Sequence, residues 1–560
     1  MYAKLDGRTH QVRTRRGDAE LQVHHVGPLP ILRHFLDRMA FSRIVSSCIG
    51  TGRQIASHAQ TLSVLIQNIL LSPSPLYRIA SALGLTPEEK SSINDDRVAR
   101  ALDALVSVPA RSLFFRLALH VIKQFEIDTA RVHHDTTTVT FHGQYGGSFA
   151  EPRITQGHNK DHRPELKQLV FGINVAADGA VPLSHEIYSG NRTDDTVHGA
   201  NVDTLRQLLG RDDFIYVADS KLATRKNLKH IDDYGGKFVS VLPRSRAEDQ
   251  RFRRQLRKGL QARWRRFLVQ ENKRRQSDPP DVYSSTSAGP EKTEDGFRLV
   301  WRRSSQKASS DAQAREISLR RAEAELFGLA SRINTRELKS RASILNRAHA
   351  IVRNHQCKSF IALKVQTETK VETRRLRRGR PGKDDPVRYM RSRVFRLEYS
   401  RIKESLKAEA RTDGVFPLVT NLAPGRVSKK ELLLIYKYQP YVEKRHSLLK
   451  SELEVAPVYL KKPRRAAGLV HAVFLAIMVD ALIERELRTS MATAGIDSLP
   501  ILPEGRPSKT PTTARLLEMF SGVAWYEFER NEEAVTFPVK LTPLQVRLLK
   551  LLEIDPTVYA

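Results

Sequence analysis

The sequence predicts an α/β protein in which a large mixed α+β insertion interrupts the core and a helical domain precedes it. Apolar residues recur at helical spacing over residues 29–119, and strand patterns replace them from residue 132. From there, three runs typical of antiparallel strands are followed by a helix, a strand, a helix and a strand. This order of elements is that of a ribonuclease-H-like catalytic core.

The N-terminal segment, residues 1–128, is expected to form a helical domain. Apolar side chains share one helix face over residues 31–36, and a second apolar helix covers residues 62–70. Residues 92–96 offer side chains suited to capping a third helix. The pattern leaves open whether this domain binds DNA or only packs.

Residues 129–245 are expected to form the first part of the core. Residues 132–141 are rich in Thr and Val, residues 168–176 alternate in polarity, and Asp178-Gly179 predicts a hairpin turn to the next strand. The elements predicted after this turn are a strand at 181–187, a helix at 193–209, a buried strand at 214–218, a helix at 223–230 and a strand at 238–242.

Residues 246–425 are expected to form the insertion, which is basic and long enough to have its own fold. Residues 251–275 interleave Arg and Lys with aromatic side chains and few acids, which favours phosphate contact over a merely solvated helix face. The other elements predicted here are a helical stretch at 312–352 and strands at 360–365, 394–397 and 415–419.

A short basic motif lies within the insertion. Arg377-Arg378-Gly379-Arg380-Pro381 matches the core of an AT-hook, in which Arg378 and Arg380 would enter a narrow minor groove. A flexible basic loop with no groove preference is an equally open alternative.

Residues 426–490 are expected to complete the core with a helix that bears Glu443. At about 100° per residue, Tyr436, Gln439, Glu443 and Lys450 fall within about 40° of one direction. Pro440 requires either a kink or a new helix that starts there. The remaining expectations are a buried helix at 469–483, too short to span a bilayer, and a C-terminal region, 491–560, with short helices at 511–517 and 541–552.

Composition restricts the classes of partner and compartment. The net charge of +31 and a sequence pI near 10.2 favour a polyanion, because each neutralised phosphate releases condensed counterions. Charge alone does not separate DNA from RNA or a membrane surface. Cys48 and Cys357 are the only cysteines, which excludes a disulfide framework and fits a reducing compartment. The N-terminus lacks the apolar run of a signal peptide, so a cytoplasmic protein is expected.

Three acidic residues have the setting of a catalytic site. Asp135 lies in a predicted strand, Asp219 closes the apolar run Phe-Ile-Tyr-Val-Ala, and Glu443 lies on the predicted helix. Taken singly, each aspartate is explained by a strand-end cap and the glutamate by a solvated ion pair. Together, two strand carboxylates and one helix carboxylate can hold a pair of divalent cations for phosphodiester chemistry.

The motifs around these residues resemble the DDE transposases of bacterial insertion sequences, in the group marked by Tyr-x2-Arg-x3-Glu-x6-Lys and its branch numbered sixteen thirty-four. The resemblance covers about residues 26–450. It is carried by His134-Asp135-Thr136-Thr137-Thr138, Gly157-His-Asn-Lys-Asp-His-Arg-Pro-Glu-Leu-Lys-Gln168, Gly190-Asn191 with Asp194, Val217-Ala218-Asp219-Ser220, the strand from Asp413-Gly414 to Thr420-Asn421, Ile93-Asn94-Asp95-Asp96-Arg97 and Val26-Gly27-Pro28-Leu29-Pro30.

The resemblance implies a DNA transposase that binds terminal inverted repeats, cleaves DNA and transfers strands with two Mg²⁺ ions, for which Mn²⁺ can substitute. Asp135, Asp219 and Glu443 would be the catalytic residues and metal ligands. The implied partners are double-stranded DNA, as transposon ends and target, and a second copy of the chain in a homodimer. The implied location is the bacterial cytoplasm, in association with the nucleoid and not with a membrane. The DNA-binding residues expected are Tyr436, Gln439, Lys450, Lys160, Arg163, Arg378 and Arg380.

One residue departs from the group. Gln439 stands where the group has Arg, and glutamine cannot supply the charge with which that Arg grips a phosphate. Lys450, Lys444 and Arg445 are the nearby residues able to compensate. Three other functions remain open: a ribonuclease-H-like nuclease that cuts without joining, a catalytically inactive transposon-derived DNA-binding protein, and, with no RNA-binding strand motif in its favour, an RNA-binding protein.

Overall fold

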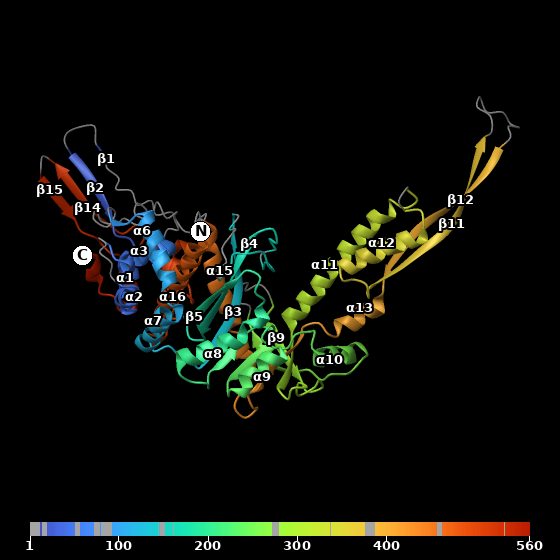
Figure 1. Ribbon diagram of the computed structural model, residues 1–560, viewed down its shortest axis with the longest axis horizontal. Helices are drawn as coiled ribbons and strands as arrows, with labels where there is room; N and C mark the ends of the chain where they lie inside the picture. Colours follow the sequence, from blue (N-terminus) through green and yellow to red (C-terminus); the bar gives the residue numbers. More distant parts are fainter. Residues whose placement is uncertain are drawn as a thin grey trace. The chain divides into compact units, whose positions relative to one another are not determined.

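The chain divides into two compact units, the core unit (1–240 with 431–560) and the insertion unit (241–430). The structure is a computed structural model, drawn in Figure 1. It describes residues 12–13, 19–50, 56–71, 79, 92–143, 145, 152–160, 162–271, 279–335, 338–375, 387–455, 462–530 and 533–560.

The core unit contains a mixed sheet with the strand order β5-β4-β3-β6-β7. β3 pairs antiparallel with β4, and β4 with β5, whereas β6 lies parallel to both β3 and β7. This order and these directions are those of a ribonuclease-H-like fold, and the predicted sequence of strands and helices is confirmed. The elements are β3 (Arg131–Phe141), β4 (Lys167–Ala176), β5 (Pro182–Ser189), η2 (Asp194–Thr196), α8 (His198–Leu209), β6 (Ile215–Val217), α9 (Arg225–Asp233) and β7 (Lys237–Val241).

Local chemistry explains where these elements turn and end. The β4–β5 hairpin turns through residues 177–180, in which Gly179 and Ala180 both have positive φ. The side chain of Thr224 accepts a hydrogen bond from the Asn227 amide and caps α9. α8 ends at Gly210, which takes up the left-handed conformation.

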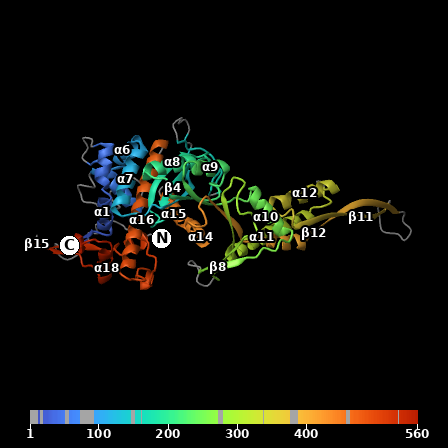
Figure 2. The same ribbon diagram turned by 90° about the horizontal axis from the view of Figure 1, so that it is seen from below.

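Among the described N-terminal helices, α1, α3 and α6 pack on α16, a long helix from the C-terminal part of the chain. Figure 2 shows α16 beside α6 and α7. Gly468 permits close approach, because a Cβ there would lie 2.8 Å from the carbonyl oxygen of Leu102 on α6. The helices are α1 (Leu29–Arg38), α2 (Phe41–Ile49), α3 (His58–Leu71), α6 (Asp95–Ser107), α7 (Ala110–Gln124) and α16 (Pro463–Thr493).

By length and composition alone, α16 could cross a membrane, since its most apolar window has a mean hydropathy of 2.2. That window is 94% buried inside the protein, however. The core helices of soluble proteins pass the same test, so this finding is weak evidence for a span. The predicted buried helix at 469–483 is confirmed as part of α16.

The two ends of the described chain share a second sheet, with the order β1-β2-β14-β15. Trp525 on β14 stacks on His24 of β2, with 3.7 Å between the ring centroids. The sequence patterns predicted the two short C-terminal helices but not this pairing. The elements are β1 (Val12–Arg13), β2 (Ala19–His25), α17 (Thr513–Glu518), β14 (Ala524–Arg530), β15 (Glu533–Phe537) and α18 (Pro543–Leu551).

The insertion unit combines an antiparallel sheet, in the order β13-β10-β9-β8, with a helix pair and a long two-stranded ribbon. The expected helical stretch at 312–352 is two helices, because the chain turns between them through Asn334 at a φ of 69°. The elements are α10 (Ala247–Arg257), β8 (Arg265–Gln270), β9 (Asp281–Thr286), β10 (Arg298–Ser304), α11 (Ser305–Ala330), α12 (Arg341–Asn354), β11 (Ile361–Arg375), β12 (Val387–Arg401), α13 (Lys403–Ala410) and β13 (Val415–Thr420).

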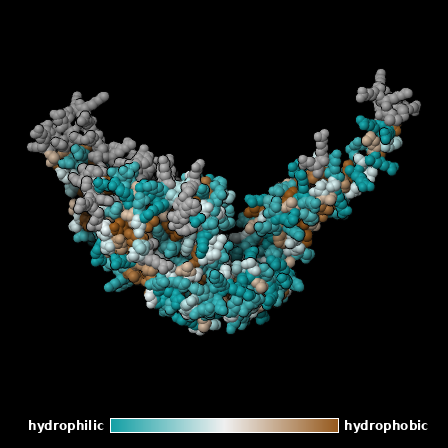
Figure 3. All heavy atoms as spheres, in the orientation of Figure 1, coloured by the Kyte–Doolittle hydropathy of each residue, from teal (hydrophilic) through white to brown (hydrophobic). Residues whose placement is uncertain are grey.

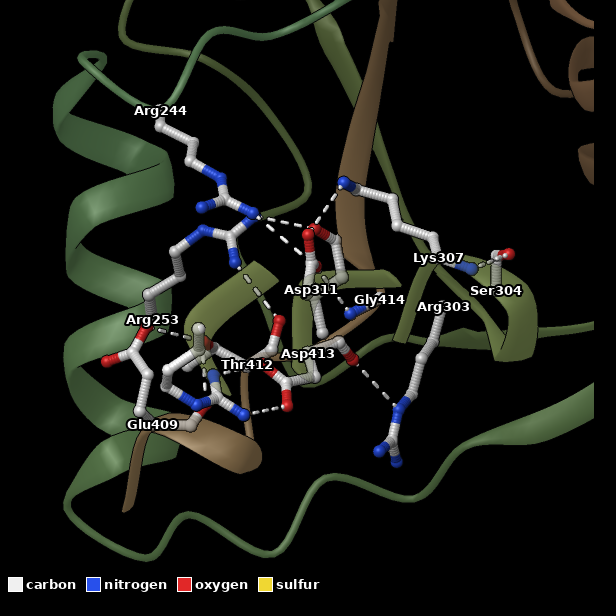
Figure 4. Close-up of polar contacts among 12 residues, drawn as sticks. Arg244, Arg253, Arg303, Ser304, Lys307, Asp311, Glu409, Thr412, Asp413 and Gly414 are labelled. Carbon is white, nitrogen blue, oxygen red and sulfur yellow. Dashed lines mark hydrogen bonds and ion pairs between the residues drawn. The ribbon is translucent and has the colours of Figure 1, made fainter. Parts of the chain in front are cut away.

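Part of the basic segment 251–275 holds the insertion unit together. Arg253 is buried and pairs with Asp249 at 2.6 Å. It also donates to the carbonyl oxygen of Thr412 (Figure 4) and to that of Val415. Arg257 pairs with Glu409 at 2.7 Å. The prediction of phosphate contact is therefore wrong for Arg253, whose charge is already neutralised. It stays a prediction for the exposed residues Arg251, Arg254, Lys258, Arg263, Arg265 and Arg266.

Candidate active site

The first two predicted carboxylates lie on neighbouring parallel strands, Asp135 within β3 and Asp219 two residues after the end of β6. His133 of β3 is opposite Val217 of β6, and Asp135 and Asp219 each come two residues later. Both carboxylates therefore lie at the same level of the sheet, at the carboxyl end of β6, where open α/β sheets place their ligands. The loop at Asp219 is held in place, because its carboxylate accepts from the Lys221 amide at 2.9 Å and its carbonyl accepts from Ser240 at 2.7 Å.

The electrostatics of these two carboxylates favour a nearby cation. Burial raises the pKa of Asp135 and of Asp219, and the negative charge of Asp135 raises the pKa of Asp219 further. Lys160 acts in the opposite direction on the pKa of both groups. A buried pair of carboxylates is most stable in its ionised form when positive charge lies beside it.

Lys160 supplies part of that charge through a compact polar cluster. Its ammonium donates to the carbonyl oxygen of Thr136 at 2.6 Å and to the Thr136 hydroxyl at 2.8 Å. It also pairs with Asp194 at 3.1 Å, and Asp194 accepts from the Thr136 hydroxyl at 2.7 Å. Burial would raise the pKa of Asp194, but the Thr136 hydrogen bond and the Lys160 charge outweigh it and lower that pKa. Asp194 is thus ionised beside the two aspartates.

The segment 157–168 braces this lysine. The amide of Gln168 donates to the Gly190 carbonyl at 2.7 Å and accepts from Asn159 at 2.9 Å. The backbone here is so close that a Cβ on Gly157 would lie 2.0 Å from the Gly190 carbonyl oxygen. Glycine is required at such an approach. The long motif therefore has a structural task, which is to fix the loop that carries Lys160 against β3.

The helix bearing Glu443 does not include Tyr436. α14 (Lys429–Tyr436) ends before α15 (Gln439–Val455) begins, so the expectation of one helix face through all four residues is wrong. Pro440 lies in the first turn of α15, where a missing N–H breaks no helical hydrogen bond. Of the two alternatives for Pro440, a new helix is therefore confirmed.

Gln439 joins α15 to the strand that bears Asp135. It is buried; its amide nitrogen donates to the His134 carbonyl at 2.8 Å, and its amide oxygen lies 3.1 Å from Nδ1 of His133. Burial lowers the pKa of His133 to about 4, so its ring is neutral and donates from Nδ1 to this oxygen. Both polar atoms of Gln439 are thus engaged with residues adjacent to Asp135, and this geometry connects the helix to the strand.

His446, one turn after Glu443, faces Asp135. Its Nε2 lies 3.6 Å from a carboxylate oxygen of Asp135. Burial, with the charges of Lys160 and Lys450, lowers the pKa of His446 to about 3, so the ring is neutral. No other described residue offers a hydrogen-bond partner to either ring nitrogen. His446 is therefore a neutral ring directly beside the Asp135 carboxylate.

Glu443 is exposed, whereas Asp135 and Asp219 are both half-buried. Burial raises the pKa of the Tyr436 hydroxyl, and the negative charges of Asp219, Glu443 and Asp135 raise that pKa further. Among the residues that the structure describes, no three Asp, Glu, His or Cys side chains are close enough to hold a metal ion. The three carboxylates hence share one neighbourhood without forming a coordination shell.

Arg445 anchors α15 from its opposite side. It is 2% exposed at the side chain and donates to the carbonyl oxygens of Gly179 and Ala180 in the β4–β5 turn. It also pairs with Asp480 and Glu484 of α16. Lys444 pairs with Glu484 at 2.7 Å. Arg445 is therefore not available to replace the phosphate-gripping arginine of the resembling group, and that expectation is wrong for this residue.

The other predicted DNA-binding residues lie in different settings. Lys450 is close enough to Asp135 for its charge to lower the pKa of that carboxyl group. Arg163 is exposed and pairs with Glu165 at 2.5 Å. Arg378 and Arg380, with the whole AT-hook match, lie outside the described residues.

Local sequence patterns predict no role for Asp194 or His446. Asp194 follows Gly190-Asn191 in a quoted motif, but its contact with Thr136 joins residues 58 positions apart. His446 is three residues after Glu443, a spacing that puts both on one side of a helix. That spacing was the one local signal available for His446.

Several solved structures are similar to this chain, two transposase complexes among them. No family model and no curated protein matches the chain. A Mos1 transposase paired-end complex with left transposon end matches at 11% identity and a TM-score of 0.15, covering 34% of this chain and 60% of the Mos1 chain. A piggyBac transposase synaptic complex with hairpin DNA matches at 10% identity and a TM-score of 0.23, covering 80% and 72%. At these TM-scores the likeness establishes neither fold nor activity, which depend on the residues of the chain itself.

Proposed function

We propose that this protein is a DNA transposase of the DDE type, acting on the terminal repeats of a bacterial insertion sequence. The observation that carries the proposal is the pairing of β3 with β6, which brings Asp135 and Asp219 to one edge of a ribonuclease-H-like sheet. Glu443 follows on a helix that Gln439 attaches to β3. The basic excess of the chain supports double-stranded DNA as the partner.

We propose that Asp135, Asp219 and Glu443 hold two Mg²⁺ ions, with Mn²⁺ as a substitute. The donor chemistry fits, because all donors are carboxylate oxygens and a cation offsets the burial and repulsion that raise the pKa of both aspartates. When bound, such ions activate a water or a DNA 3′-hydroxyl and stabilise the departing oxygen. Glu443 completes the set only after a shift toward the aspartates.

The chain's own residues contribute orientation and positive charge. Lys160, held by Thr136 and Asp194, sets positive charge beside both aspartates. Tyr436 keeps its proton at neutral pH, since its pKa is raised, and can donate to a phosphate oxygen. Lys450 adds a second positive charge near Asp135. Joining two element ends in one complex requires two copies of the chain, so we also propose a homodimer.

The test is Mg²⁺-dependent cleavage and strand transfer on DNA that carries the flanking terminal repeats. The wild type should cut and join, whereas Glu443→Gln should bind the ends and lose both activities by about a thousandfold or more, since a metal ligand is worth several kcal/mol. Glu504→Gln, which removes an exposed carboxylate elsewhere in the core unit, is the matched control and should retain activity.

Each other outcome selects a different function. Cutting without joining would identify a nuclease. Equal activity of wild type and Glu443→Gln would remove Glu443 from the site. Tight DNA binding without chemistry in either protein would identify an inactive DNA-binding protein.

A further inference from the structure

The ribbon formed by β11 and β12 is firmly attached at its base. All fifteen residues of β11 pair with β12, from Ile361 opposite Arg401 to Arg375 opposite Val387. At the base, Val365 and Leu397 are buried in one apolar cluster with α11 and α12. Asn334 adds two hydrogen bonds to the backbone of Phe395, at 2.8 and 3.0 Å. The base therefore holds the ribbon in a defined direction on the helix pair.

The face that packs on the helices continues beyond them. Residues directly opposite in register share a face, and successive residues alternate. The inner face, which includes Val365 and Leu397 at the base, continues outward as the pairs Thr369 with Arg393, Val371 with Arg391 and Thr373 with Tyr389. At about 3.3 Å per residue this outer stretch is roughly 20 Å long from Thr367 to Thr373. Val371 is 52% exposed and Tyr389 67% exposed, so no described residue covers it.

The acidic residues of the ribbon all lie on the opposite face. Glu368, Glu372 and Glu398 are the carboxylates of β11 and β12, and each occupies an outer-face position in the register. Glu372 pairs there with Lys370 at 2.8 Å. The inner face beyond the helices thus presents Arg391 and Arg393, two threonines, a valine and a tyrosine without a carboxylate. In Figure 3 the ribbon is mainly hydrophilic, with isolated hydrophobic side chains.

The ribbon belongs to the unit that holds most of the chain's charge. The insertion unit has 47 Lys and Arg against 21 Asp and Glu, a net charge of +26 out of +31. An acid-free surface on such a unit complements a polyanion. Among polyanions, duplex DNA has a major groove about 12 Å wide that admits a two-stranded ribbon.

We infer that the inner face of the distal ribbon, with Arg391, Arg393 and Tyr389, is a binding surface for duplex DNA. This inference rests on the proposed function for its partner and adds the element that contacts it. Arg391 and Arg393 contact phosphates, while Tyr389, Val371 and the threonines pack along the groove. The surface works independently of sequence, because phosphate contacts position a protein without reading bases.

The test measures DNA binding by the full-length protein without Mg²⁺, on a labelled duplex of unrelated sequence and over a series of salt concentrations. Arg391→Gln/Arg393→Gln should bind about tenfold more weakly and reduce the slope of log K against log salt by about one per arginine. The matched control, Arg388→Gln/Arg396→Gln, removes the same charge from the outer face of the same ribbon. It should change affinity by less than about twofold and leave the slope nearly unchanged.

Two further variants separate charge from shape. Arg391→Lys/Arg393→Lys should restore the slope, because lysine also neutralises phosphates. Tyr389→Ala should weaken binding while the slope stays the same. Equal losses for the inner-face and outer-face variants would overturn the inference, because the charge would then act without a defined face. A change of oligomeric state in the inner-face variant without DNA would assign the surface to a second copy of the chain instead.

Failure of the ribbon surface and failure of the catalytic proposal give different experimental results. A wild type that binds through the ribbon but neither cuts nor joins would refute the transposase function and leave the ribbon surface in place. A wild type that cuts and joins, with an inner-face variant that binds as well as it does, would refute the ribbon surface alone.

Discussion

The core unit and the insertion unit contain nearly the same number of basic residues but differ in what balances them. The core unit has 46 Lys and Arg against 41 Asp and Glu, and the insertion unit has 47 against 21. The excess positive charge of the chain is therefore concentrated in the unit that lacks the three candidate catalytic carboxylates. A net charge computed over the whole chain therefore does not locate a polyanion-binding surface.

The two units also use individual arginines differently. In the core unit Arg445 is buried between Asp480, Glu484 and two backbone carbonyl oxygens, where it fixes the helix that carries Glu443. In the insertion unit a few arginines, such as Arg253, are used in this way, while Arg391 and Arg393 are exposed. Buried arginines should therefore contribute to stability, and exposed arginines of the insertion unit to DNA binding.

The largest expected effect comes from a buried arginine of the insertion unit. Arg253→Met leaves Asp249, which is fully buried, without its cation, and leaves the carbonyl oxygens of Thr412 and Val415 without a donor. Breaking such a pair should lower the free energy of unfolding by about 3–5 kcal/mol, measured by urea denaturation. Arg254→Met, on the exposed side of α10, should change it by less than about 0.5 kcal/mol.

DNA binding completes this test. Arg254→Met should reduce the salt slope of DNA binding if the exposed arginines of α10 contact phosphates, as the sequence predicts. Equal stability of the two variants would show that Arg253 has no structural role, and the division between the two kinds of arginine would fail.

The second effect concerns the stability that the protein loses between about pH 6.5 and pH 4, to which two buried histidines of the core unit should contribute. His471 on α16 and His185 on β5 lie 2.6 Å apart through ring nitrogens, packed against Phe114 and Phe474. Burial lowers the pKa of His471 to about 4 and that of His185 well below its usual value. In the unfolded chain each ring takes up a proton near pH 6.5, so the unfolded state binds more protons and stability falls as the pH falls from about 6.5 to 4.

The contribution of His471 alone is about 3 kcal/mol over this range. His471→Leu should therefore flatten the pH dependence of the free energy of unfolding by about that amount. His349→Leu, at an exposed position of the insertion unit, should leave it unchanged. A His471→Leu protein with the wild-type pH dependence would show that the buried pair does not cause acid lability.

The sequence was sufficient for the elements that local patterns determine. The five strands of the core sheet were predicted because apolar runs and the Asp178-Gly179 turn are local signals. The pairing of β2 with β14 joins residues about five hundred positions apart, and no local pattern carries that information. Local patterns also do not predict the outer part of the β11–β12 ribbon. Its residues mix Arg, Thr and Glu and do not alternate between apolar and polar side chains.

The candidate site shows the same limit. Asp135, Asp219 and Glu443 were chosen from their positions in strands and in a helix. Local patterns do not predict which side chains connect these elements, because Gln439 contacts His133 and His134 across more than 300 residues of sequence. A single helix face from Tyr436 to Lys450 requires one continuous helix. Instead, α14 ends at Tyr436 and α15 begins at Gln439, with Pro440 in its first turn. Tertiary packing decides which polar side chain faces the active site and which one supports it.

The smallest expected change in the free energy of unfolding comes from Gln439, which connects the helix of Glu443 to the strand of Asp135. Gln439→Leu removes both amide hydrogen bonds and should reduce DNA cleavage about a hundredfold, since a misplacement of about 1 Å can cost that much. The matched control is Gln545→Leu, because Gln545 is a buried amide that donates to the Met519 carbonyl at 2.7 Å and accepts from Thr542. Both variants should lose about 1–3 kcal/mol of stability, but only Gln439→Leu should require more Mg²⁺ for half-maximal cleavage.

Gln439→Arg distinguishes a connecting role from phosphate binding. Arginine is the residue of the resembling group, yet it has no acceptor for the His133 ring N–H. If Gln439 positions α15, the arginine variant should be as impaired as the leucine variant. If arginine instead matches or exceeds the wild type, this side chain faces DNA during the reaction. The core unit would then contribute a phosphate contact of its own, and the assignment of polyanion binding to the insertion unit would have to be shared between the two.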